Sequence, residues 1–223
     1  MSEGSSAAHQ DFILSGAMIQ QGTPEWFKQR LGKVTASKVA DVVARTKTGW
    51  GASRANYAAQ LIVERLTGIA LESFINAAMQ WGTETEPQAR AAYSFFTDHT
   101  VVEVGFIDHP AIVMSGASPD GFVGDDGLIE IKCPNTATHI DTLLGEEIDG
   151  KYIKQMQWQM ACTRRKWCDF VSFDPRLPTD LQLKIIRVER DGALIADLED
   201  DVRMFLKEVD EKLAALNGLM VAA

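Results

Sequence analysis

The sequence has few cysteines, and their spacing excludes the usual cysteine-based sites. Cys133, Cys162 and Cys168 are the three cysteines among 223 residues, and they form neither a C-x-x-C pair nor an even set of disulfides. The four histidines form no H-E-x-x-H zinc motif. No apolar run approaches the roughly 20 residues that span a membrane, and residues 1–10 lack the basic and apolar regions of a signal peptide. We therefore expect a protein of the reducing cytoplasm, with no membrane partner.

The chain also has fewer basic than acidic residues. The chain has 22 Lys and Arg against 31 Asp and Glu, a net charge of −9, which by itself argues against nucleic acid as a partner. The charge is uneven, however, because residues 1–70 carry a net +3 and residues 71–130 a net −9. The basic N-terminal third could still contact phosphates, and such contacts weaken as salt rises. Charge alone fits a solvated surface at least as well.

The chain has enough apolar residues for a sizeable core. Hydrophobic residues make up 46% of the sequence, which favours one domain over residues 11–223 after a flexible tail at residues 1–10. Helical and strand patterns alternate, so we expect an α/β fold with a sheet between helices. Helices are expected from residue 24, over 36–44, 53–68 and 73–95 with a bend near Gly82 or Pro87, and over 151–164 and 191–217. Strands are expected over 101–107, 111–115, 117–123, 128–133, 167–173 and 181–188, and the expected helix caps are Thr23, Thr35 or Ser37, and Ser53.

The most informative stretch runs from Ser118 to Lys132. Asp125-Asp126-Gly127 separates two strand-like runs, which is a strong β-hairpin signal, so Asp120 and Glu130 should lie on neighbouring strands. Because side chains alternate along a strand, Glu130 and Lys132 share one face and leave it roughly 6.6 Å apart. This spacing brings two acids and one base within reach of a common ligand.

These residue types suit a metal-assisted reaction. Carboxylate oxygens are ligands that Mg²⁺ prefers, the main-chain carbonyl of Ile131 could add another, and Lys132 could hold or deprotonate a water. Two other interpretations fail. A calcium loop ending at Glu130 would begin at Pro119 rather than at Asp, and Ser118 is followed by Pro-Asp rather than by the x-Gly of a serine-hydrolase elbow.

Further motifs accompany this stretch along the chain. In order they are Trp26 to Val39 (WFKQRLGKVTASKV), Trp81-Gly82 with Glu86, Ser118-Pro119-Asp120-Gly121, Glu130-Ile131-Lys132-Cys133-Pro134, and Gln155-Met156-Gln157. Their order and spacing resemble the family of lambda exonuclease and the YqaJ-type viral alkaline exonucleases, within the restriction-endonuclease-like nuclease superfamily. The resemblance covers about residues 20–215. It implies a restriction-endonuclease-like core in which a mixed central β-sheet is flanked by helices.

The resemblance also implies a set of site residues. It assigns catalysis to Asp120, Glu130, Lys132 and Gln155, metal binding to Glu86, Asp120, Glu130 and Ile131, and DNA or 5′-phosphate binding to Arg30, Ser37, Ser118 and Met79. The cofactor would be Mg²⁺, with Mn²⁺ as a substitute. Gln157 and Gln159 are left as structural residues.

Some of these residues have a simpler interpretation. Ser37 could serve only as a helix cap and Met79 only as a core side chain, and a single Glu such as Glu86 is usually a solvated charge. Residues 45–51 form a basic loop in which Arg45 and Lys47 could contact a DNA backbone or minor groove, although they would suit solvent equally well.

The sequence thus supports three hypotheses. The first, whose strand polarity is implied by the resemblance alone, is a Mg²⁺-dependent 5′-to-3′ exonuclease that digests one strand of double-stranded DNA from its ends and leaves a 3′ single strand for phage-type recombination. The resemblance implies that such an enzyme is a homotrimer in the bacterial cytoplasm and has a single-strand annealing protein as its partner. The second is a structure- or sequence-specific endonuclease of the same superfamily. The third is a non-catalytic DNA-binding assembly subunit, for which loss of Asp120, Glu130 or Lys132 would be the signal; all three residues are present.

Overall fold

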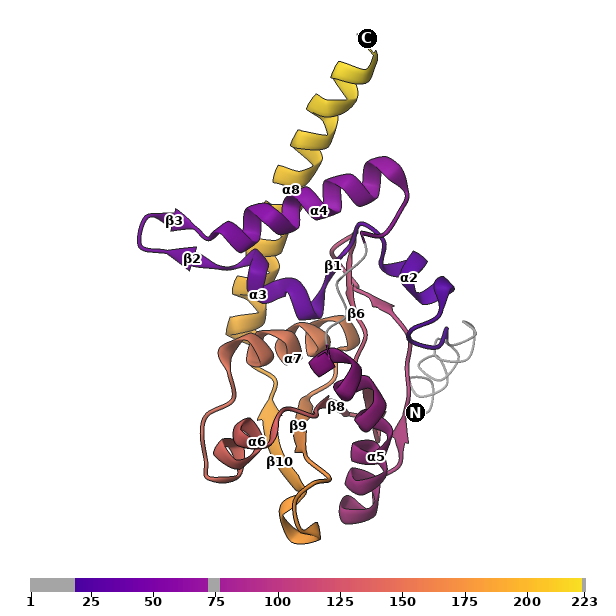
Figure 1. Ribbon diagram of the computed structural model, residues 1–223. Coiled ribbons are helices and arrows are strands. Elements are labelled where there is room, and N and C mark those ends of the chain that lie inside the picture. The colour runs from indigo at the N-terminus through magenta and orange to yellow at the C-terminus, as the bar shows by residue number, and fades with distance from the viewer. Residues whose placement is uncertain (1–18, 72–76, 222–223) are drawn as a thin grey trace, which may run out of the picture.

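The computed structural model describes residues 19–71 and 77–221 (Figure 1). Within these residues the main sheet has five strands in the order β10, β9, β8, β7, β4. They are Leu183–Glu189, Trp167–Phe173, Gly127–Lys132, Gly121–Val123 and Val101–Val102. The β8–β9 pair is parallel and the other three pairs are antiparallel. The expected mixed sheet is therefore confirmed.

Helices cover both faces of this sheet. On one face, Tyr93 of α5 (Ala77–Thr97) packs against a cluster that includes Ile129 of β8. On the other face, Met156 of α7 (Gly150–Thr163) packs in a cluster that includes Leu128. Because β8 alternates, Glu130 lies on the Leu128 face and therefore points toward α7. Both faces of β8 are buried, including the face that carries Glu130. From the sequence, only the opposite face, with Ile129 and Ile131, was expected to be apolar.

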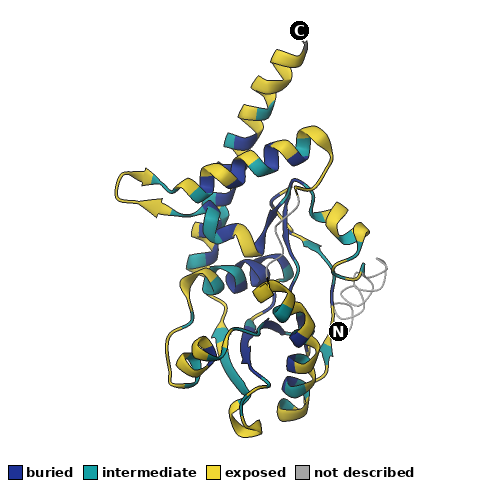
Figure 2. Ribbon diagram, viewed as in Figure 1, coloured by how far each residue is buried: buried dark blue, intermediate teal, exposed yellow. Residues whose placement is uncertain are grey.

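A second group of elements packs beside the main sheet. Its three-stranded sheet has the order β1, β6, β5, with β1 and β6 parallel. The elements of this part are β1 (Val34–Thr35), β5 (Ile107–Asp108), β6 (Ser115–Ala117), α2 (Pro24–Arg30), η1 (Ala36–Lys38), α3 (Val39–Val42), α4 (Ala52–Thr67) and α8 (Gly192–Val221). Helices α3, α4, α7 and α8 share a buried core that contains Leu61, Trp158 and Phe205. The C-terminal end of α8 extends beyond this body and is exposed (Figures 1 and 2).

Smaller elements complete the fold. Helix α6 (Thr136–Leu143) follows β8, and η2 (Thr179–Leu181) precedes β10. The residues expected to form a basic loop instead form a hairpin of β2 (Arg45–Thr46) and β3 (Gly49–Trp50), which protrudes in Figure 1. None of the helices in the described ranges is both long and apolar enough to cross a membrane.

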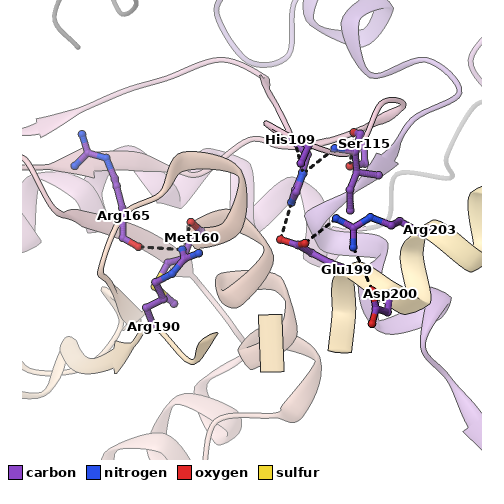
Figure 3. Close-up of polar contacts among 10 residues, drawn as sticks. His109, Ser115, Met160, Arg165, Arg190, Glu199, Asp200 and Arg203 are labelled. Atoms are coloured by element: carbon purple, nitrogen blue, oxygen red, sulfur yellow. Dashed lines mark hydrogen bonds and ion pairs between the residues drawn. The ribbon is translucent and has the colours of Figure 1, made fainter. Parts of the chain in front are cut away.

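A polar contact centred on His109 connects α8 to the rest of the molecule (Figure 3). The imidazole is buried, its Nδ1 accepts backbone N–H groups at 3.1 and 3.2 Å, and its ring stacks on Trp158. Its Nε2 lies 3.4 Å from Oε1 of Glu199 on α8. Burial lowers the pKa of His109, and the nearby Glu199 offsets this only in part. The contact therefore holds a neutral imidazole against the helix.

Several local expectations are confirmed. The side chain of Thr23 caps α2 by accepting the backbone N–H of Trp26 at 3.3 Å, and Pro24 is the first helical residue. Helix α4 ends at Gly68, which adopts a left-handed conformation with φ of 69°. Strand β9 has the expected bounds, and α7 begins and ends one residue before the expected ones.

Other local expectations are wrong. The helix expected over residues 36–44 is divided into η1 and the shorter α3; Thr35, one of the two expected caps, is the N-cap residue of η1, but its side chain makes no cap hydrogen bond. Gly51 rather than Ser53 precedes the first turn of α4. Helix α5 is not interrupted at Gly82 or Pro87, because the packing of its buried face on the sheet outweighs the hydrogen bond that proline removes; the bend near these residues stays a prediction. The part of this expected helix at residues 72–76 lies outside the described residues.

The strands expected over residues 101–107 and 111–115 are also wrong. The structure has the short strands β4, β5 and β6 instead, and β5 and β6 belong to the smaller sheet rather than to the one that carries the acidic hairpin. The reason is a long-range pairing, in which Val34 lies opposite Ser115 and Thr35 opposite Gly116. Local patterns do not contain this information.

Candidate active site

The hairpin of β7 and β8 brings Asp120 beside the backbone of β8. Gly121 pairs with Ile129 and Val123 with Gly127, so the residue before β7 lies next to Glu130 and Ile131. Oδ2 of Asp120 accepts the backbone N–H of Ile131 at 2.6 Å. The tight turn expected at residues 125–127 thus places the first carboxylate at the end of the strand that carries the second.

Glu130 is the centre of the cluster, with a side chain that is only 1% exposed. Its Oε1 accepts hydrogen bonds from Nζ of Lys132 at 2.5 Å and from Nε2 of Gln155 at 2.7 Å. Its Oε2 accepts Nε2 of Gln159 at 2.6 Å. A buried carboxylate is stabilised only when it is well paired, and here three donors surround it.

Glu86 approaches from α5. Its Oε1 lies 2.5 Å from Nη2 of Arg90, one turn further along the same helix. The same Arg90 nitrogen lies 3.4 Å from the carbonyl oxygen of Asp120, and Nη1 pairs with Glu103 at 3.2 Å. Arg90 therefore links the α5 carboxylate to the hairpin that carries Asp120.

The electrostatics show that these groups influence one another. Burial raises the pKa of Asp120 well above its usual value, and the carboxylates of Glu130 and Glu86 raise it further. Burial also raises the pKa of Glu86. For Lys132, burial lowers the pKa, but Glu130 and Asp120 outweigh it and leave the pKa above its ordinary value. The site is thus short of positive charge even with Lys132 protonated.

The donor chemistry fits a hard divalent cation, although no closed metal cage is present. Among the side chains that the structure describes, no group of three or more His, Cys, Asp and Glu is arranged to hold a metal ion. Glu86 and Glu130 are instead paired with protein donors. The raised pKa of Asp120 indicates that an added positive charge would be favourable here, and carboxylate and carbonyl oxygens are the ligands that Mg²⁺ takes.

A cleft of about 1000 Å³ opens over this cluster. Glu86, Ile131 and Lys132 line it, together with Trp81 and Met79 of α5. Other walls come from α6 and from the segment that leads into α7. The cleft therefore gives a ligand access to Glu86, to Lys132 and to the backbone at Ile131, directly beside the buried Glu130.

Arg30, Trp26 and Ser118 form a separate polar cluster. Nη1 of Arg30 donates to Oγ of Ser118 at 3.2 Å, and Nε1 of Trp26 donates to the same oxygen at 3.0 Å. The guanidinium lies 3.9 Å from the centre of the indole ring. Burial lowers the pKa of Arg30 to about 10. Because Ser118 is two residues before Asp120 in sequence, this group presents a cation and a hydroxyl near the strand that carries the first carboxylate.

The remaining candidates lie further from these contacts. Ser37 is exposed, and its hydroxyl is 3.5 Å from that of Thr35. Met79 is exposed and lines the cleft, so it is not the core residue that the simpler interpretation suggested. Arg45 stacks on Trp50 and forms an ion pair with Asp201 at 3.1 Å. Lys47 is exposed in the turn of the β2–β3 hairpin.

Sequence reasoning missed the contacts of two residues. Gln159 was assigned a structural role, although it contacts Glu130 as directly as Gln155 does. Their spacing of four residues on a helix placed both on one face, which was the available signal. No sequence pattern pointed to Arg90, because its contacts with Glu86 and with the hairpin depend on how α5 packs against the sheet.

Comparisons with known proteins agree with this architecture. The YqaJ-like viral recombinase domain matches residues 25–166. An alkaline exonuclease, LHK-Exo from Laribacter hongkongensis, is 58% identical, with a TM-score of 0.84 over 90% of this chain and 99% of that one. The same values apply to LHK-Exo in complex with dAMP. A phage-related exonuclease from Haemophilus somnus 129PT shares the fold, with 16% identity and a TM-score of 0.64 over 82% of this chain and 96% of that one.

The fold and these matches define a nuclease of the exonuclease class. Within that class, the chain belongs to the YqaJ-like viral recombinase family. The resemblance drawn from the sequence motifs and the expected fold class are therefore both confirmed.

Proposed function

We propose that this protein is a Mg²⁺-dependent exodeoxyribonuclease that digests the 5′-ended strand of double-stranded DNA and leaves a 3′ single strand. The observation that carries the proposal is the buried Glu130 carboxylate, held against Lys132 and next to Asp120 where a large cleft reaches the sheet. A phosphodiester entering this cleft would meet Glu86 and Lys132 on its wall, with Glu130 and Asp120 directly behind them. The relationship to an alkaline exonuclease supports end-dependent hydrolysis.

The metal would be held by Asp120, Glu130, Glu86 and the carbonyl of Ile131. When bound, Mg²⁺ supplies positive charge to the phosphate oxygens and makes water a better nucleophile. Mn²⁺ offers the same oxygen-ligand chemistry and should substitute. The protein's own contribution is to hold these oxygens in place through the Ile131 N–H bond to Asp120 and the donors around Glu130.

Lys132 would act directly on the reacting groups. Because Glu130 and Asp120 keep its pKa high, Lys132 is a cation at neutral pH and serves first as a hydrogen-bond donor. It can orient the attacking water and stabilise negative charge as it develops on the phosphate. Gln155, which shares an oxygen of Glu130 with Lys132, would orient both the carboxylate and the substrate.

The end of the DNA strand would be recognised by the cluster of Arg30, Trp26 and Ser118. A guanidinium and a hydroxyl are suitable donors to a terminal 5′-phosphate, and Ser37 of η1 would add a second hydroxyl, the role that the family resemblance gives it. Ser118 of this cluster precedes Asp120 by two residues, so the cluster would set the distance from the strand end to the scissile bond. This arrangement would favour removal of nucleotides from a 5′ end.

Our proposal for the wider assembly is supported by the resemblance to the exonuclease family. We propose a homotrimer that encloses the duplex, a single-strand annealing protein as its partner in recombination, and a cytoplasmic location in the bacterial host. Met79 would help to part the strands from the cleft wall, and Lys47 on the exposed hairpin would contact the DNA backbone. Arg45 could join it only by releasing Asp201.

End-labelled duplexes test this proposal directly. Linear DNA with 5′-phosphate or 5′-hydroxyl ends is incubated beside a covalently closed circle, with Mg²⁺ or with a chelator. We expect processive release of nucleotides from the 5′-phosphorylated strand with Mg²⁺ only, and an intact circle. Efficient cutting of the circle would instead establish an endonuclease, and absence of any hydrolysis would favour a non-catalytic subunit.

A further inference from the structure

Helix α7 carries three glutamines that make two different kinds of contact. Gln155 and Gln159 donate to the two oxygens of Glu130 at 2.7 and 2.6 Å. Gln157 faces away, donating to the carbonyl of Glu189 at 2.8 Å and accepting the N–H of Asp191 at 2.9 Å. Both Gln157 and Gln159 are buried.

Within the described part of the chain, the side-chain amide of Gln159 uses only one of its two ends, and such a half-paired buried amide does not stabilise the fold. Its side chain is 0% exposed, and among the described residues its Oε1 has no hydrogen-bond partner, whereas Gln157 uses both ends of its amide. Burying an unpaired carbonyl is unfavourable, and an apolar side chain of the same shape would avoid it. The benefit of an amide at position 159 must therefore lie in its single hydrogen bond to Glu130.

That hydrogen bond has a geometric consequence. Lys132 and Gln155 both contact Oε1 of Glu130, so these two donors alone would leave the carboxylate free to rotate about that oxygen. Gln159 is the donor to Oε2 and so fixes the second point of the carboxylate.

We propose that Gln159 is a positioning residue that orients Glu130 for Mg²⁺ binding. This inference rests on the proposed function, because it takes Glu130 as a metal ligand. Residues that hydrogen-bond a metal ligand typically contribute 10- to 100-fold to metal affinity or activity. We expect a loss of that order in Mg²⁺ affinity when the amide is removed, with a smaller loss of kcat at saturating Mg²⁺.

The experiment compares Gln159→Leu and Gln159→Met with the matched control Gln157→Leu. All three remove a buried amide from the same helix, but only the first two remove a donor to Glu130. For each full-length protein, Mg²⁺ binding is measured by titration calorimetry, the rate on 5′-phosphorylated duplex is measured as a function of Mg²⁺, and thermal unfolding is recorded in chelator. The methionine variant preserves length and flexibility, so it provides a second measurement if the leucine variant is poorly folded.

The proposal predicts a 10- to 100-fold weaker Mg²⁺ affinity in both Gln159 variants and an affinity within about twofold of wild type in Gln157→Leu. It also predicts that Gln157→Leu is the variant that loses more thermal stability. Wild-type Mg²⁺ affinity in the Gln159 variants would overturn the positioning role. If wild-type protein neither binds Mg²⁺ nor digests duplex ends, the proposed function itself fails. That outcome is distinguishable from failure of the positioning role alone, in which the wild type is active and the Gln159 variants bind Mg²⁺ as tightly.

Discussion

Replacing Asp120 with asparagine should make the metal-free protein more stable while abolishing its activity. Asn keeps the shape of the side chain and offers an oxygen for the N–H of Ile131, which Asp120 now accepts at 2.6 Å. The substitution removes a negative charge that is unfavourable where it lies, because burial and the carboxylates of Glu130 and Glu86 raise the pKa of Asp120. Since Asn is a poorer ligand for Mg²⁺, turnover should be lost.

The size of the effect follows from linkage. Each unit by which a carboxyl pKa is raised corresponds to about 1.4 kcal/mol of unfavourable interaction in the charged form. The direction of the shift in Asp120 is already net of the favourable Lys132 and Ile131 N–H, and substitutions that relieve an unfavourable interaction commonly stabilise a protein by about 0.5–2 kcal/mol, so we expect a gain of about 1–2 kcal/mol. In a chain of this size that raises Tm by roughly 2–8 °C. Mg²⁺ at about ten times its Kd should stabilise the wild type by about 1.4 kcal/mol but leave the variant unchanged.

The assay is thermal unfolding of both proteins in chelator and in Mg²⁺, together with digestion of a 5′-phosphorylated duplex. Asp125→Asn is the matched control, because it removes a charge from the exposed turn of the same hairpin. The control should unfold at the wild-type temperature and retain activity. A lower Tm for Asp120→Asn in chelator would refute the electrostatic argument, and near-normal turnover with Mg²⁺ would refute the site assignment.

Three further predictions concern other groups. Lys132→Ala should reduce turnover by at least about a hundredfold with the fold retained, because it removes the donor aimed at the reacting groups; a tenfold or smaller loss would assign Lys132 a structural role. Arg30→Ala should slow digestion of 5′-phosphorylated ends more than of 5′-hydroxyl ends, whereas replacement of the exposed Lys28 by Ala should slow both equally or not at all. Equal losses on both kinds of end in Arg30→Ala would show that Arg30 does not bind the 5′-phosphate. Because burial lowers the pKa of His109, the unfolded chain binds its proton more readily, so the wild type should lose stability as pH falls below about 6.5, by up to about 1.4 kcal/mol per pH unit. In His109→Gln the free energy of unfolding should fall less steeply with decreasing pH. If the stability profiles of the variant and the wild type run parallel between pH 7.5 and 5.5, the reasoning is wrong.

The hairpin shows why part of the site could be predicted. The turn at residues 125–127 and the alternation along β8 are local properties, so the neighbouring positions of Asp120 and Glu130 and the shared face of Glu130 with Lys132 followed from spacing alone. The four-residue spacing of Gln155 and Gln159 likewise placed both amides on one face of α7. The motif order then identified the family.

The errors arose where distant segments compete with local preference. Pro87 disfavours a helix interior by local rules, yet α5 runs through it because its buried face packs on the sheet. Ser115 was expected at the end of a strand, but the observed strand begins there because Ser115 pairs with Val34, 81 positions away in sequence. Neither result can be read from a window of neighbouring residues.

The sequence by itself determined the chemistry of this protein: which acids, amides and bases are available, how the hairpin spaces them, and to which family their order belongs. Only the tertiary structure decided which of them meet, because Glu86, Arg90 and Gln159 reach the hairpin from helices that lie far from it along the chain. It also decided their charge states, since burial of Asp120 and Lys132 depends on the packing of α5 and α7 against opposite faces of the sheet. Local sequence sets hydrogen-bonding capacity, whereas the dielectric surroundings and partners of a group are properties of the whole fold.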